Sequence, residues 1–215
     1  MKTLDGTLLL AHWYAPEDVK AIADYVGDSL GLIQYAQEAD AKRIVFAGVK
    51  FMGETTKVML PDTEVIMPDI NATCSLVTQT DLDELYRWSE ANDATHVMYI
   101  NSSVRMKAMA DIIVTSANVN KIIEGEIDSG HHVIFSPDFN MGTYINKEFG
   151  YNMRVFSSVC DVHDGFAADQ LKKEMGGWTD GGKFVIAHPE SPLDILEMAD
   201  FVGSTNNMLN WVRAF

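Results

Sequence analysis

One seven-residue motif, called the phrase below, occurs in three variants along this chain of 215 residues. It reads Ala-Asp-Tyr-Val-Gly-Asp-Ser at 23–29, Ala-Asp-Ile-Ile-Val-Thr-Ser at 110–116 and Ala-Asp-Phe-Val-Gly-Ser-Thr at 199–205. The copies begin 87 and 89 residues apart, which is the size of a small domain. Repetition at a nearly fixed period indicates that one structural unit is used several times. The sequence therefore predicts three related units, 1–90, 91–165 and 166–215, and we expect the third to be incomplete.

Polar residues and cysteines follow the same register. The two cysteines, Cys74 and Cys160, lie 51 and 50 residues after the first residue of the first two phrases. The other aligned residues are counted from the first alanine of each phrase. Eleven residues before it stand His12, Tyr99 and His188, and nine before it stand Tyr14, Asn101 and Glu190. Six residues after it stand Ser29, Ser116 and Thr205.

Short apolar runs alternate with stretches of helical spacing. A helix is expected from Pro16, with Val19, Ile22 and Ala23 on its buried face. Strands are expected at 7–11, 25–26, 43–47, 64–67, 96–100, 112–114, 133–136, 154–156, 184–187 and 201–202. This order is typical of α/β proteins, so we predict a pseudo-threefold repeat of three-layer α/β units with parallel sheets and a truncated third unit.

The aligned polar residues all fall in loops that follow strands. Ligands of open parallel sheets bind beyond the carboxyl ends of the strands, so these loops could form one shared pocket. The alternative for Ser29, Ser116 and Thr205 is simple capping of helices. Capping and anion binding are compatible, because free amides at a helix start attract carboxylate or phosphate.

Composition narrows the choice of partners. The formal net charge is −15 and no basic cluster is present, which argues against nucleic acid. No long apolar run and no signal-peptide pattern is seen, so we expect a cytoplasmic protein without a membrane partner. Two distant cysteines do not form a disulfide framework.

The chain resembles quinolinate synthase, the iron–sulfur enzyme of NAD biosynthesis. The resemblance rests on a dozen short motifs in the same order, among them Ala-His-Trp-Tyr at 11–14, Lys-Phe-Met-Gly-Glu-Thr at 50–55, Cys-Ser-Leu at 74–76, Cys-Asp-Val-His at 160–163 and His-Pro-Glu at 188–190. It implies three α/β domains around a [4Fe–4S] cluster that is held by one cysteine from each domain. It also implies the condensation of iminoaspartate with dihydroxyacetone phosphate to quinolinate.

The resemblance assigns roles to individual residues. Cys74 and Cys160 match cluster ligands. Glu190, His188, Tyr14 and Tyr99 match catalytic residues of the pocket. The residues that match substrate-binding positions are His12, Ser29, Asn101, Ser116, Ser204 and Thr205.

Several alternatives stay open at this point. The third cluster cysteine of the family has no counterpart in this chain. A further ligand of the cluster could therefore be His163, Asp161, a small molecule or a group from another chain. Zinc on both cysteines with a histidine fits the ligand types, although no spacing favours it. Glu190 could be an exposed loop carboxylate.

The whole chain could also be a cluster-free relative that binds a dicarboxylate or phosphate or has a regulatory role, or it could be one subunit of a split enzyme. The apolar closing helix through Leu209 and Val212 should pack on the first unit, where it would close the pocket, or on a second copy in a homodimer. A partner chain could also cover the truncated third unit.

Overall fold

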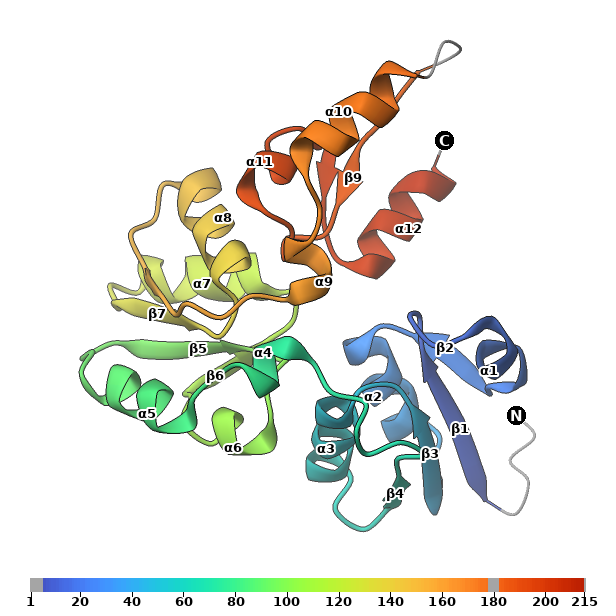
Figure 1. The fold of residues 1–215 in the computed structure, drawn as a ribbon. Coiled ribbons are helices and arrows are strands. Elements are labelled where there is room, and N and C mark those ends of the chain that lie inside the picture. The colour runs from blue at the N-terminus through green and yellow to red at the C-terminus, as the bar shows by residue number, and fades with distance from the viewer. Residues whose placement is uncertain (1–5, 178–181, 215) are drawn as a thin grey trace. The chain divides into compact units, whose positions relative to one another are not determined.

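The computed structural model describes residues 6–177 and 182–214 (Figure 1). By packing, the chain divides into two compact units. The first comprises the described residues up to Thr78 together with Ile100–Ala108. The second comprises Gln79–Tyr99 and the described residues from Met109 onward. The division into 1–90, 91–165 and 166–215 stays a prediction.

The first unit contains a four-stranded parallel sheet with the order β2-β1-β3-β4. Alternating strands and helices produce this topology, because parallel neighbours need a crossover connection. The strands are β1 (Thr7–His12), β2 (Tyr25–Gly27), β3 (Arg43–Ala47) and β4 (Glu64–Ile66); the helices are α1 (Glu17–Ile22), α2 (Ser29–Glu38), α3 (Lys50–Met59), α4 (Ser75–Thr78) and α6 (Val104–Lys107).

The core of the first unit lies around β1 and β3. Leu8, Leu10, Ile44 and Phe46 are fully buried there, and all four belong to runs that were predicted as strands. The expected buried face of α1 is wrong, because this helix buries no residue and Ile22 is 73% exposed. Six residues make fewer than two helical turns, and the apolar spacing alone does not decide whether another element covers them.

The second unit contains two parallel sheets, one with the order β6-β5-β7-β8 and one formed by β9 and β10. The α/β class with parallel sheets is therefore confirmed. The strands of the second unit are β5 (Thr95–Tyr99), β6 (Ile112–Val114), β7 (Val133–Ser136), β8 (Arg154–Val155), β9 (Ile186–Ala187) and β10 (Phe201–Val202). The helices of this unit are α5 (Leu82–Glu90), α7 (Val119–Asp128), α8 (Phe139–Phe149), α9 (Asp161–Asp164), α10 (Ala168–Gly176), α11 (Leu193–Leu196) and α12 (Thr205–Arg213).

The aspartate of the repeated phrase makes the same contacts in all three sheets. Asp24, Asp111 and Asp200 each accept the backbone N–H of the residue fifteen positions earlier, at 2.8 Å in every case. Each also donates its own N–H to the carbonyl of that residue, at 2.8, 3.0 and 2.7 Å. The aspartate thus fixes the start of one strand beside the first strand of its sheet.

Two glycines at matched positions allow a helix to approach its sheet closely. Gly53 in α3 and Gly142 in α8 stand 89 residues apart. A Cβ atom on Gly142 would lie 2.5 Å from Val155 Cγ1, and one on Gly53 would overlap Met67. A larger residue at Gly142 would require Val155 and Phe135 to shift, and one at Gly53 would require the Met67 side chain to move.

The closing helix α12 packs on the two-stranded sheet of its own unit. The Trp211 ring lies 5.4 Å from Phe184 in an edge-to-face contact and 5.8 Å from Phe201 in a stacked one. Among the described residues, no helix combines the length and the apolar character needed to cross a membrane.

Candidate active site

Both cysteines occupy the same place in their units. Cys74 lies between β4 and α4, and Cys160 lies between β8 and α9. The Cys74 carbonyl accepts the Thr78 N–H at 3.1 Å, and the Cys160 carbonyl accepts the Asp164 N–H at 2.8 Å. The repeat therefore extends to the geometry of the cysteine loops, each of which leads into a one-turn helix.

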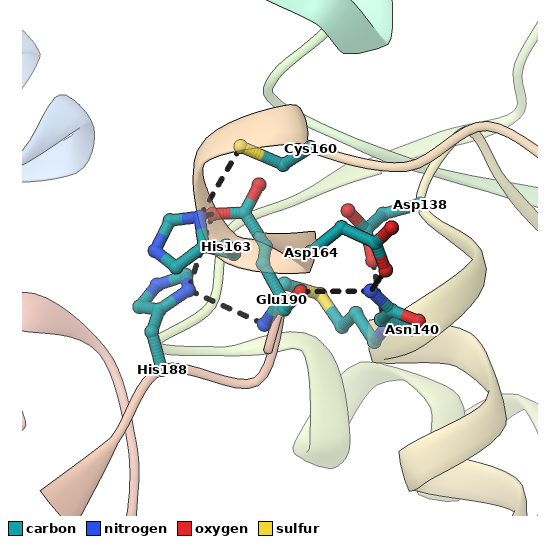
Figure 2. A network of polar contacts seen from close by, with 8 residues as sticks. Asp138, Asn140, Cys160, His163, Asp164, His188 and Glu190 are labelled. Carbon is teal, nitrogen blue, oxygen red and sulfur yellow. Dashed lines mark hydrogen bonds and ion pairs between the residues drawn. The ribbon is translucent and has the colours of Figure 1, made fainter. Parts of the chain in front are cut away.

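One turn of α9 places His163 beside Cys160 (Figure 2). Residues three positions apart share one face of a helix, and the His163 Nδ1 lies 3.2 Å from the Cys160 Sγ. Both residues are buried, Cys160 at 7% and His163 at 9% exposure. A thiol that is held against an imidazole in this way can pass its proton to the ring.

Glu190 reaches the same place from the loop between β9 and α11. Its Oε2 lies 3.1 Å from the Nδ1 of His188 and 3.4 Å from the Nδ1 of His163. The two imidazole rings stack with centroids 5.0 Å apart. Glu190 is 2% exposed, so the alternative of an exposed loop carboxylate is wrong. Burial of a carboxylate is costly unless partners offset it, and the two histidines are such partners.

Asn140 connects this loop to α9 (Figure 2). Its Nδ2 donates to the backbone carbonyl of Glu190 at 3.1 Å and to Asp164 Oδ1 at 3.1 Å. Asn140 is the second residue of α8, and it is itself buried. One amide therefore fixes the backbone that carries the Glu190 carboxylate.

Asp138 lies next to this network and is fully buried. Its Oδ1 accepts the Met141 N–H at 2.7 Å, which caps α8. Its Oδ2 is buried and has no hydrogen-bond partner among the described residues. A buried polar atom in this state calls for an explanation.

Burial and charge shift two pKa values here. Burial raises the pKa of Asp138 well above its ordinary value, and the nearby negative charges of Glu190 and Cys160 raise it further. Burial alone would lower the pKa of His163, but the Cys160 hydrogen bond and the Glu190 charge outweigh it and raise that pKa. Both shifts favour the protonated form of the group concerned, by burial at Asp138 and by the contacts with Cys160 and Glu190 at His163.

The first unit holds a similar local turn. The His12 Nδ1 accepts the Tyr14 N–H at 3.3 Å, as the His188 Nδ1 accepts the Glu190 N–H at 3.4 Å. The rings of His12 and Tyr14 meet edge to face at 4.7 Å. His12 is 6% exposed and Tyr14 is 64% exposed, so the histidine is fixed and the tyrosine is presented outward.

Lys107 holds the loop that carries Asn101. Its Nζ donates to the backbone carbonyls of Ile100, at 2.8 Å, and of Ser102. It also lies 5.4 Å from the centroid of the Phe51 ring. Burial lowers the pKa of Lys107 to about 7, despite the charge of a nearby glutamate. The Lys107 side chain therefore binds the backbone on both sides of Asn101 and holds this loop in place.

The remaining candidate residues follow strands or begin helices. Tyr99 is the last residue of β5 and is buried, and Ser116 follows β6. Simple capping by Ser29, Ser116 or Thr205 is wrong, because none of them is the N-cap of a helix. The N-caps of α2, α7 and α12 are Asp28, Asn118 and Ser204, and the Ser204 hydroxyl accepts the Asn207 N–H at 3.2 Å. Ser29 and Thr205 are instead the first residues of α2 and α12.

Sequence reasoning gave no role to Asp138 or Asn140 and considered His163 only as a ligand. A signal for His163 was present, because its spacing of three from Cys160 places both on one helical face. A signal for Asn140 was also present, because Asn-Met-Gly at 140–142 repeats Phe-Met-Gly at 51–53 with a polar residue in the first position.

The fold and this site define a repeated α/β protein in which strand-end loops gather a cysteine, histidines and a carboxylate. Comparison with known proteins specifies it further: residues 1–214 match the family model of the quinolinate synthetase A protein, and the chain belongs to that family. It is 42% identical over 212 residues to quinolinate synthase of Trichodesmium erythraeum, 40% over 207 to that of Microcystis aeruginosa and 41% over 208 to that of Chloroherpeton thalassium. These alignments cover 96–97% of this chain and 63–64% of those relatives.

Each of the two units contains one cysteine, the residue type that holds iron–sulfur groups. Thiolates are the usual ligands of such clusters, and the two thiols stand on equivalent loops that follow the last strand of each four-stranded sheet. At Cys160 the imidazole Nδ1 of His163 lies 3.2 Å from the sulfur.

Proposed function

We propose that this chain performs the condensation of iminoaspartate with dihydroxyacetone phosphate to quinolinate, with loss of phosphate and water. The observation that carries the proposal is the buried Glu190 carboxylate, which lies between two imidazoles in the unit that contains Cys160. This reaction needs proton transfers at carbon, nitrogen and oxygen, and a carboxylate paired with imidazoles is suited to them.

The cofactor belongs to the same proposal. Cys74 and Cys160 would hold two irons of a [4Fe–4S] cluster, which when bound supplies a Lewis acid that polarises a substrate oxygen. In this proposal His163 keeps the Cys160 sulfur ionised by donating its Nδ1–H to it.

Glu190 is proposed as the acid–base residue. Its Oε2 can take up a proton from substrate, and the His188 Nδ1 at 3.1 Å can share that proton. The burial of both side chains excludes bulk water, which strengthens each electrostatic contact. The Asn140 amide keeps the Glu190 backbone in register during these transfers.

The other candidates are proposed as substrate contacts. His12, Ser29, Asn101, Ser116, Ser204 and Thr205 would bind the carboxylates and the phosphate, assisted by amides at the starts of α2 and α12. Tyr14 and Tyr99 would line the pocket. A second copy or a partner chain beside the two-stranded sheet, and a location in the cytoplasm, where thiols stay reduced, are further parts of the proposal.

The test starts from anaerobically purified protein. We expect a brown protein with iron and sulfide in comparable amounts that forms quinolinate from the two substrates. Glu190→Gln should keep the iron content and lower turnover by about a hundredfold or more. Glu148→Gln, on the exposed end of α8, is the matched control and should keep full turnover. Colourless protein that is inactive but is stabilised by dicarboxylates would favour a cluster-free binding relative instead.

A further inference from the structure

Three different metal-ligand types converge at the start of α9 (Figure 2). The Cys160 Sγ, the His163 Nδ1 and a carboxylate oxygen of Glu190 all lie within 4.8 Å of one another. The Sγ and Nδ1 are 3.2 Å apart, and the Nδ1 and the Glu190 Oε2 are 3.4 Å apart. The three side chains come from two separate segments, the one-turn helix α9 and the loop after β9.

These separations resemble those around a single tetrahedral ion. With metal–sulfur bonds of about 2.3 Å and metal–nitrogen and metal–oxygen bonds of about 2.0–2.1 Å, tetrahedral angles keep the ligand atoms about 3.3 to 3.6 Å apart. The sulfur–nitrogen and nitrogen–oxygen separations lie at or next to this range, and the separation between the sulfur and the carboxylate oxygen is at most 4.8 Å. A mixed set of sulfur, nitrogen and oxygen ligands suits a borderline ion such as Zn²⁺ or Co²⁺.

The surrounding charges favour a cation. Glu190 and Asp138 are buried carboxyl groups, and the Asp138 Oδ2 has no hydrogen-bond partner among the described residues. The nearby charges of Glu190 and Cys160 oppose the ionisation of Asp138. A positive ion beside these buried carboxyl groups would offset the cost of burying them in ionised form.

A second shell is also present. The His188 Nδ1 lies 3.1 Å from the Glu190 Oε2, and the Asn140 amide holds the Glu190 backbone carbonyl. Contacts of this kind orient ligating carboxylates in known metal sites. The ligand atoms are therefore held in place before any ion arrives.

We propose that the chain without its cluster binds one divalent transition-metal ion of the Zn²⁺ or Co²⁺ type through Cys160, His163 and Glu190, with water as the fourth ligand. This site goes beyond the proposed function, because it needs one of the two cysteines and no sulfide. The single ion and the cluster exclude each other, since both use the same sulfur. Binding of the ion would therefore block cluster assembly.

The experiment uses the whole chain, treated with a chelator and kept reduced, and titrates it with Co²⁺ alone. We expect one Co²⁺ per chain, visible bands of tetrahedral intensity and a near-ultraviolet thiolate-to-cobalt band, all displaced by Zn²⁺. Cys160→Ser should abolish the near-ultraviolet band, and His163→Gln and Glu190→Gln should each weaken Co²⁺ binding more than tenfold. Cys74→Ser is the matched control and should keep both the band and the affinity. Thermal melts of each variant without metal report whether it remains folded.

Three outcomes would overturn the proposal. One is the absence of a thiolate band in the unaltered chain. A second is equal loss of the band in Cys74→Ser, which would indicate a site on both cysteines. The third is full Co²⁺ affinity in folded His163→Gln and Glu190→Gln proteins. The proposed function has its own readout, because the cluster needs iron, sulfide and Cys74, so either idea can fail alone.

Discussion

Replacing Asn140 with leucine should destabilise the second unit and misplace Glu190. Leucine has nearly the same size, so the packing of α8 is kept while two hydrogen bonds are lost. The bond to the Glu190 carbonyl leaves a buried acceptor unpaired, at a cost of about 1 to 2 kcal/mol, and the bond to the Asp164 carboxylate contributes about 1.5 kcal/mol or more. Together these losses are about 3 kcal/mol in the free energy of unfolding.

For a chain of this size, each kcal/mol shifts the melting temperature by about 2 to 4 °C, so Asn140→Leu should melt about 6 to 12 °C lower. The assay is thermal unfolding followed by circular dichroism, with turnover measured well below the transition. Asn120→Leu, at an exposed position of α7, is the matched control and should change stability by less than about 0.5 kcal/mol. An Asn140→Leu protein that melts with the unaltered chain and keeps full turnover would refute the positioning role.

The remaining predictions concern the cysteines, one lysine and the repeated aspartate. Cys74→Ser and Cys160→Ser should each lose bound iron in anaerobic preparations while the circular dichroism spectrum is unchanged; full iron content in either variant would contradict its assignment as a ligand. Because Lys107 has a pKa of about 7 when folded and about 10.4 when unfolded, the unfolded chain binds more protons between these values, so stability should rise as pH increases through this window. Lys107→Met should flatten that slope in unfolding titrations, and an unchanged slope would exclude Lys107 as its source. Asp111→Ala should cost about 1 kcal/mol in urea unfolding, because the carboxylate that accepts the His96 N–H is removed; no change in the midpoint would show that this bond does not stabilise the fold.

Local patterns in the sequence contained most of the architecture. The strands at 43–47, 112–114, 133–136 and 201–202 have the predicted bounds, and the ends of the others differ by one or two residues. The reason is that short apolar runs and their spacing to the repeated phrase reflect contacts within one sheet. The Asp24, Asp111 and Asp200 bonds are the physical form of that repeat.

Burial could not be obtained in the same way. The spacing of Ile22 favoured a buried face for α1, yet the side chain is mostly exposed. Glu190 follows a proline in a loop, where a carboxylate is normally solvated, yet it is buried between two histidines. In both cases the outcome depends on which distant segment covers the residue, and periodicity carries no information about that.

The sequence by itself therefore determined the repeated α/β units, the equivalent places of Cys74 and Cys160, and which polar residues lie in the loops at the ends of strands. Only the tertiary structure decided that His163, Glu190 and Asn140 meet, because they come from three segments that are joined by no local pattern. Hydrogen bonds within a strand or a helical turn are encoded by neighbouring residues. A buried polar cluster instead exists only when separate segments pack and satisfy one another's charges.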